Sequence, residues 1–208
     1  MTRAGRHGIL FAASTLAMAL GAWLAPYATV WERISVVSAW TFMGLLTAAL
    51  LIGPMRNLSG TTPPLNIYIR RDLGIWSALN GILHFVAGNV VGMNAGYVAA
   101  FVRTPTPELD VAVRDQLFST GAIAGTLIVL LLFLLLAISS DRALRWLGPG
   151  KWKWIQRSAH VVLWLSIIHG IEFQLLERRL LPLVALVIMA ILIFSVQLRS
   201  RRRSANPY

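Results

Sequence analysis

The chain has 208 residues, of which 57% are hydrophobic and only 13% are charged, and its formal net charge at pH 7 is +11. Soluble domains carry about 25% charged residues, so this composition argues against a soluble globular domain and predicts a polytopic membrane protein. The basic residues flank the apolar blocks, where they orient a membrane protein, and we therefore expect no nucleic-acid partner. Cysteine is absent, which excludes disulfides, thiolate-held zinc and Cys-held iron–sulfur clusters.

Six blocks along the chain are long and apolar enough to cross a bilayer, whose hydrocarbon core takes about 20 residues of helix. We therefore expect an all-α fold, a six-helix transmembrane bundle that forms a single domain over residues 1–208. The spans are expected at approximately 8–30, 34–55, 73–97, 120–139, 154–176 and 180–198. The first block follows two arginines, as a signal peptide does, but its length predicts a retained helix.

Lysine and arginine gather on one side of these spans. That side carries Arg3, Arg6, Arg56, Arg70, Arg71, Arg142, Arg145, Lys151, Lys153, Arg157, Arg199, Arg201, Arg202 and Arg203. The other side carries only Arg33, Arg103, Arg114, Arg178 and Arg179. Because basic loops stay inside, we expect both termini in the cytoplasm of a multi-pass protein of the bacterial inner membrane. Residues 103–119, on the outer side, are a candidate for a short interfacial helix that caps the bundle.

Three histidines lie inside apolar spans, His84 in the third and His160 and His169 in the fifth. Ionisable residues within a membrane are costly and usually functional, and histidine is a common ligand of metals and of haem. We therefore take His84, His169 and His160 as candidate cofactor-binding and metal-ligating residues, and we expect no catalytic residue. His7, which precedes the first span, is expected to be an ordinary interfacial residue.

The third and fifth spans run in the same direction, so the depths of their histidines can be compared by counting residues. His84 lies 13 residues after Arg71, and His169 lies 12 residues after Arg157, so the two side chains reach similar depths. Such a pair can face each other across one porphyrin. His160 lies about 13 Å nearer the cytoplasm than His169 and about 180° around the helix, so one straight helix cannot direct both at the same partner. The other interpretation is hydrogen bonding between helices.

Glycines recur every seven residues on the predicted third helix, at Gly74, Gly81 and Gly88. Small residues let another group approach the backbone closely. The repeat is equally consistent with a slot for a cofactor and with close packing of a neighbouring helix.

Two segments resemble the ferric reductase-like transmembrane domain family. The stretch from Arg70 to Trp76 (RRDLGIW), with His84 eight residues further on, resembles its third helix, and the stretch from Trp152 to Arg157 (WKWIQR), followed by His169, resembles its fifth. The family includes the haem-bearing membrane subunit of the bacterial periplasmic methionine sulfoxide reductase system. The resemblance implies b-type haem bound by histidines of these two helices, with electrons crossing the membrane.

The match to the family's ligand positions is partial. His84 matches the first histidine of the third helix, and His169 matches the second histidine of the fifth. Gln156 stands at the first position of the fifth helix, with His160 one turn later, and Val98 stands near the second position of the third. We therefore expect one haem b, held by His84 and His169, with His84 and His160 as the alternative pair.

The resemblance implies an electron-transfer subunit of an oxidoreductase rather than a complete enzyme. The sequence contains no Gly-rich dinucleotide motif, so a separate protein or a quinol has to donate the electrons. The expected partners are a flavoreductase or quinol as donor, which would supply a flavin or a quinone, an acceptor on the outer side, and the lipid bilayer. The rival hypotheses are a haem-free membrane scaffold or small transporter derived from this fold, and a quinone-binding anchor without haem.

Overall fold

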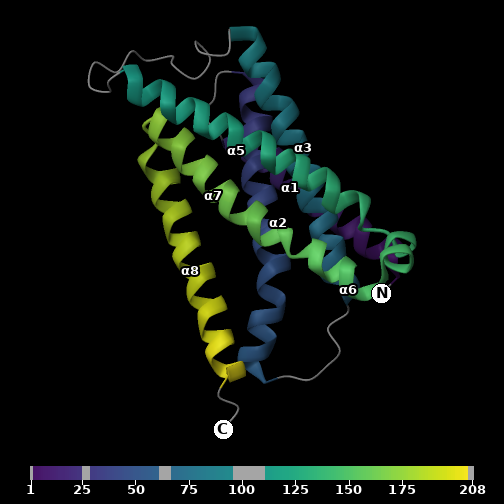
Figure 1. Cartoon of the computed structure of the whole chain (residues 1–208). Helices are drawn as coiled ribbons and strands as arrows, with labels where there is room; N and C mark the ends of the chain where they lie inside the picture. Colours follow the sequence, from purple (N-terminus) through teal and green to yellow (C-terminus); the bar gives the residue numbers. More distant parts are fainter. Residues whose placement is uncertain (1, 25–28, 61–66, 96–110, 206–208) are drawn as a thin grey trace.

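The structure is a computed structural model that describes residues 2–24, 29–60, 67–95 and 111–205. Almost all of these residues are helical (Figure 1). The helices are α1 (Arg3–Leu24), α2 (Val30–Ser59), α3 (Ile67–Ala95), α5 (Val111–Ala137), α6 (Asp141–Gln156), α7 (Ser158–Leu176) and α8 (Leu180–Ala205). Six segments are long and apolar enough to cross a membrane, namely α1, α2, α3, α5, α6 together with α7, and α8. The predicted all-α fold with six membrane-length helices is confirmed.

The second helix, α2, is central to the bundle, where it packs against α1, α3, α7 and α8 (Figure 1). It starts at a reciprocal cap, in which the Glu32 backbone N–H donates to Thr29 Oγ1 and the Thr29 backbone N–H donates to Glu32 Oε2. It ends at Gly60, whose φ of 66° is a left-handed conformation that glycine adopts without a steric penalty. Both ends of the central helix are therefore set by local sequence.

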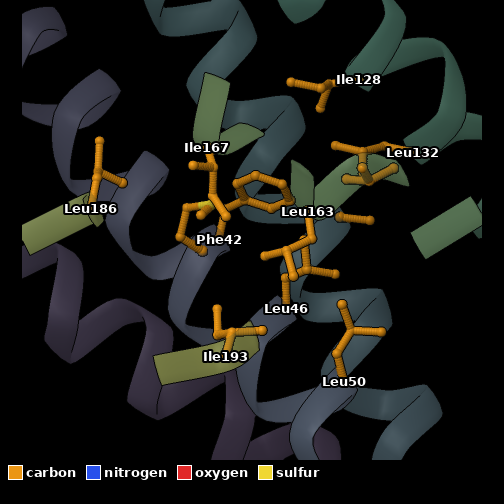
Figure 2. Close-up of a cluster of buried hydrophobic side chains, with 12 residues drawn as sticks. Phe42, Leu46, Leu50, Ile128, Leu132, Leu163, Ile167, Leu186 and Ile193 are labelled. Atoms are coloured by element: carbon orange, nitrogen blue, oxygen red, sulfur yellow. The ribbon is translucent and has the colours of Figure 1, made fainter. Parts of the chain in front are cut away.

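The apolar core lies where α2, α5, α7 and α8 meet (Figure 2). Its members include Phe42, Leu46 and Leu50 of α2, Ile128 and Leu132 of α5, Leu163 and Ile167 of α7, and Leu186 and Ile193 of α8. Each of these side chains is buried among other side chains of the bundle. Lipid is as apolar as these side chains. They therefore stabilise the helix bundle by close packing rather than by removal from water.

The glycine repeat on α3 serves helix packing at Gly81. A Cβ atom added there would stand 2.6 Å from Leu132 Cδ1 and 3.1 Å from Phe42 Cδ2, so a larger residue would force these two side chains to move. At Gly74 nothing lies within 4 Å of such an atom. The three glycines therefore do not share one role.

The segment that joins α5 to α7 is a helix with a kink. α6 starts at Ser140, whose Oγ accepts a hydrogen bond from the Ala143 backbone N–H at 3.1 Å, and it bends at Gly148, where φ is 73°. The interfacial helix expected at 103–119 is not a separate element in the described part of the chain. Residues 111–119 are the first turns of α5, which no proline interrupts, and 103–110 lie outside the described residues, as does Val98.

A polar network fastens α1 to α3. Arg6 Nε donates to Asp72 Oδ2 at 2.6 Å, and the Asp72 side chain is fully buried. His7 Nε2 lies 3.4 Å from Asp72 Oδ1, and Trp76 Nε1 donates to His7 Nδ1 at 3.1 Å. His7 does not precede the first helix as expected, because α1 already starts at Arg3, and it takes part in the contact between α1 and α3.

Substitution of the buried carboxylate tests the importance of this network. Asp72→Asn removes the negative charge that the buried Arg6 guanidinium faces, and we expect it to lower the free energy of unfolding by about 3 kcal/mol. The matched control is Asp115→Asn, because Asp115 is 62% exposed beside Arg114 and should change stability by less than about 1 kcal/mol. The free energy of unfolding of both variants can be measured in mild detergent. Equal losses of stability would contradict the importance of the buried network around Asp72.

Candidate functional site

The structure brings together two of the three histidines. His84 on α3 and His169 on α7 have ring centroids 6.0 Å apart, with an angle of 78° between the ring planes. This is the pair whose depths matched in the sequence. Both helices belong to the membrane-length segments, so the pair lies inside the bundle rather than in a loop.

The orientation of the His84 ring is fixed from α2. His84 Nδ1 lies 2.8 Å from the carbonyl oxygen of Ser35 and 3.2 Å from its hydroxyl oxygen. A carbonyl oxygen only accepts hydrogen bonds, so Nδ1 carries the proton and donates it. In the neutral ring Nε2 then keeps its lone pair. It is the atom that can bind a metal ion or accept a hydrogen bond.

The His169 ring is fixed in the same way from α5. His169 Nδ1 donates to the carbonyl oxygen of Gly121 at 2.8 Å, and the ring packs against Phe173 with centroids 4.7 Å apart. A Cβ atom at Gly125 would stand 3.0 Å from His169 Cε1 and 3.2 Å from Nδ1. Gly125 therefore provides the space in which the imidazole lies.

Gly121 and Gly125 were missed in the sequence, although a signal for them exists. They form a Gly-x-x-x-Gly pattern, which marks a helix face that a neighbouring helix approaches closely. A Cβ atom at Gly121 would stand 2.8 Å from Phe173 Cε2, and the adjacent Thr120 hydroxyl donates to Glu172 Oε1 at 2.7 Å. The close contact between α5 and α7 therefore places the Gly121 carbonyl within hydrogen-bond distance of the His169 ring.

His160 lies apart from this pair on α7, about 13 Å further along the helix towards Arg157. The charged side chains that act on it electrostatically are those of Arg70 and Arg201. Gln156, one turn before it, lines a cavity of about 60 Å³ together with Arg70 and Arg71. No contact among the described residues joins His160 to His84 or His169, and its role as a ligand stays a prediction.

The donor set limits the chemistry of the site. Among the described residues, no three His, Asp or Glu side chains gather into a site that could hold a free metal ion. Two imidazoles complete a metal's coordination only where another group provides the remaining ligands, as a porphyrin does. Two neighbouring imidazoles, each with its Nε2 free of a proton, are a donor set that would suit a haem iron.

Comparison with known proteins points in the same direction. The chain is 32% identical over 130 residues to the protein-methionine-sulfoxide reductase heme-binding subunit MsrQ of Ralstonia nicotianae (strain ATCC BAA-1114 / GMI1000). The matched segment is 62% of this chain and 53% of that protein, so the chain spans about half the length of the relative. No family model matches the chain. The predicted resemblance to a haem-bearing membrane subunit is confirmed as a similarity to MsrQ.

The contact between Gly125 and His169 can be tested without any cofactor. Gly125→Ala places a methyl group against the imidazole, and we expect the hydrogen bond from His169 Nδ1 to Gly121 to lengthen or break. In protein labelled with ¹⁵N-histidine, the His169 ring resonances, assigned with a His169→Asn variant, should shift more than those of His160. Gly44→Ala is the matched control, since nothing lies within 4 Å of its added atom. Unchanged His169 ring resonances in Gly125→Ala would contradict the close contact between Gly125 and the His169 imidazole.

Proposed function

We propose that this chain is a membrane-embedded electron-transfer subunit that holds one b-type haem between His84 and His169. It would relay electrons through the haem towards an acceptor on the outer side of a bacterial inner membrane. The observation that carries the proposal is the pair of rings 6.0 Å apart, each with its Nδ1 hydrogen-bonded to a backbone carbonyl. Similarity to MsrQ, which is named as a heme-binding subunit, supports it.

The two imidazoles fit a haem iron in their protonation as well as their spacing. Histidines that ligate metals usually donate their other ring N–H to a carbonyl or carboxylate, which fixes the tautomer and raises the basicity of the ligating nitrogen. Ser35 and Gly121 provide that carbonyl for His84 and His169. Neither Nε2 would need to lose a proton before it could bind, because the proton of each neutral ring is on Nδ1.

Haem bound there supplies an iron that takes up and gives away one electron at a time. The chain's own part is to hold and orient the two ligands and to keep water away from them. Core side chains of α2, α5 and α7, such as Phe42, Leu132 and Leu163, fill the neighbouring interior. Burial and the hydrogen bonds to Nδ1 are the two features through which this protein would set the haem's reduction potential.

The proposed subunit needs partners on both sides of the membrane. The donor is a separate flavoreductase or a quinol, which brings its own flavin or quinone, and the acceptor is a protein on the outer side. With six spans and the basic loops inside, both termini lie in the cytoplasm. The whole chain, 1–208, acts as a single membrane domain.

Removal of each histidine in turn tests the proposal. Full-length protein expressed with ample haem should bind one haem per chain and show a Soret band with sharp α and β bands after reduction. His84→Ala and His169→Ala should each lower the haem content by at least about tenfold, because each would remove one of the two imidazoles that hold the haem. His160→Ala and His7→Ala are the matched controls, and both should keep the haem and its spectrum.

Two outcomes would contradict this assignment. Loss of haem in His160→Ala together with its retention in His169→Ala would make His84 and His160 the ligand pair. A folded but colourless wild-type protein would overturn haem binding and favour the haem-free scaffold or small transporter. Gln156 at the family's ligand position is the observation that favours that second candidate.

The orientation is tested by reporter fusions. Alkaline phosphatase is active only outside the cytoplasm, so a fusion after Tyr208 should be inactive and a fusion after Asp110 should be active. Green fluorescent protein fused at the same two positions provides the complementary control, since it should fluoresce only after Tyr208. The reverse pattern would contradict the proposed topology.

A further inference from the structure

The helix α6 contributes nothing to the core of the bundle. None of its residues is buried. Two of its tryptophans are largely exposed, Trp146 by 84% and Trp154 by 72%. Indole is a large apolar ring with one polar N–H, and membrane proteins place it at the level of the lipid headgroups. Its exposure on α6 therefore needs an explanation that packing within the chain does not provide.

Four cations accompany these tryptophans, two of them before Trp146 and two between Trp146 and Trp154. Arg142, Arg145, Lys151 and Lys153 are all exposed, and within the part of the chain that the structure describes none of the four forms an ion pair. The one acid of α6, Asp141, is bound by Arg71 of α3. We call Arg142, Arg145, Trp146, Lys151, Lys153 and Trp154 the α6 surface. It combines uncompensated positive charge with bare aromatic rings.

The bundle holds this surface in place at one end of two spans. Trp152 Nε1 donates to the carbonyl of Ile138, at the end of α5, at 2.9 Å. The Arg71–Asp141 ion pair ties the start of α6 to α3, and α7 follows directly after Arg157. α6 is therefore fixed at the junction of α5 and α7, on the right of the view in Figure 1.

We propose that the α6 surface binds anionic phospholipid headgroups of the leaflet that it borders. Lysine and arginine beside a span attract anionic lipids, and tryptophans interleaved with them enter the boundary between headgroups and acyl chains. An acidic soluble protein would account for the cations. It would not account for two bare indoles next to the bilayer, and so the lipid surface fits both observations. The proposal does not depend on haem.

The test uses full-length protein in nanodiscs of phosphatidylcholine with or without phosphatidylglycerol. The fluorescence of Trp146 is isolated as the difference between wild type and Trp146→Phe. We expect phosphatidylglycerol brominated near the headgroup to quench it at least about twofold more than brominated phosphatidylcholine. The apparent melting temperature should rise by at least about 3 °C when phosphatidylglycerol is present.

A variant with Arg142, Arg145, Lys151 and Lys153 all changed to Gln should lose both effects while it melts as the wild type does in phosphatidylcholine. The matched control changes Arg199, Arg201 and Arg202 to Gln, three exposed cations at the end of α8, and should keep the preferential quenching of Trp146. Persistence of both effects in the α6 variant would overturn the proposal. Quenching of Trp146 by aqueous iodide but not by brominated lipid would also overturn it. That result would fit a soluble acidic partner instead.

Discussion

The hydrogen bond from each imidazole to a backbone carbonyl is the interaction on which the candidate site depends. Inside a bilayer a polar N–H has no water to bind, so it has to find an acceptor within the chain. The Ser35 and Gly121 carbonyls accept the Nδ1 protons of His84 and His169. This choice settles the tautomer of each ring, and with it which nitrogen keeps a lone pair for an iron.

Those carbonyls reach the rings only because the helices approach closely. Gly125 leaves room for the His169 imidazole, and Gly121 lets α5 lie against Phe173. On α3, Gly81 admits Leu132 and Phe42 in the same manner. In a membrane, where the driving force for helix association is packing rather than escape from water, such positions determine both the stability of the bundle and the geometry of the site.

The number of membrane-length helices and the closeness of His84 to His169 could be predicted because they depend on local features, namely runs of apolar residues and a count along two helices of the same direction. The rotation of each helix about its axis depends on its neighbours, and local sequence does not encode it. For that reason the contacts of His7 with Asp72 and Trp76 were not predicted. Gly121 was missed because its role lies in a backbone oxygen.

The two halves of the site are built alike. Ser35 precedes His84 by 49 residues, and Gly121 precedes His169 by 48, so in each half a helix supplies the carbonyl to an imidazole on the next membrane-length segment. Each half therefore contains its own acceptor and its own ring. During synthesis, α2 and α3 can align the first imidazole while α7 is still on the ribosome. The two rings can face each other only after the second pair of helices has entered the membrane, so binding of the proposed haem between them would be a late event in biogenesis.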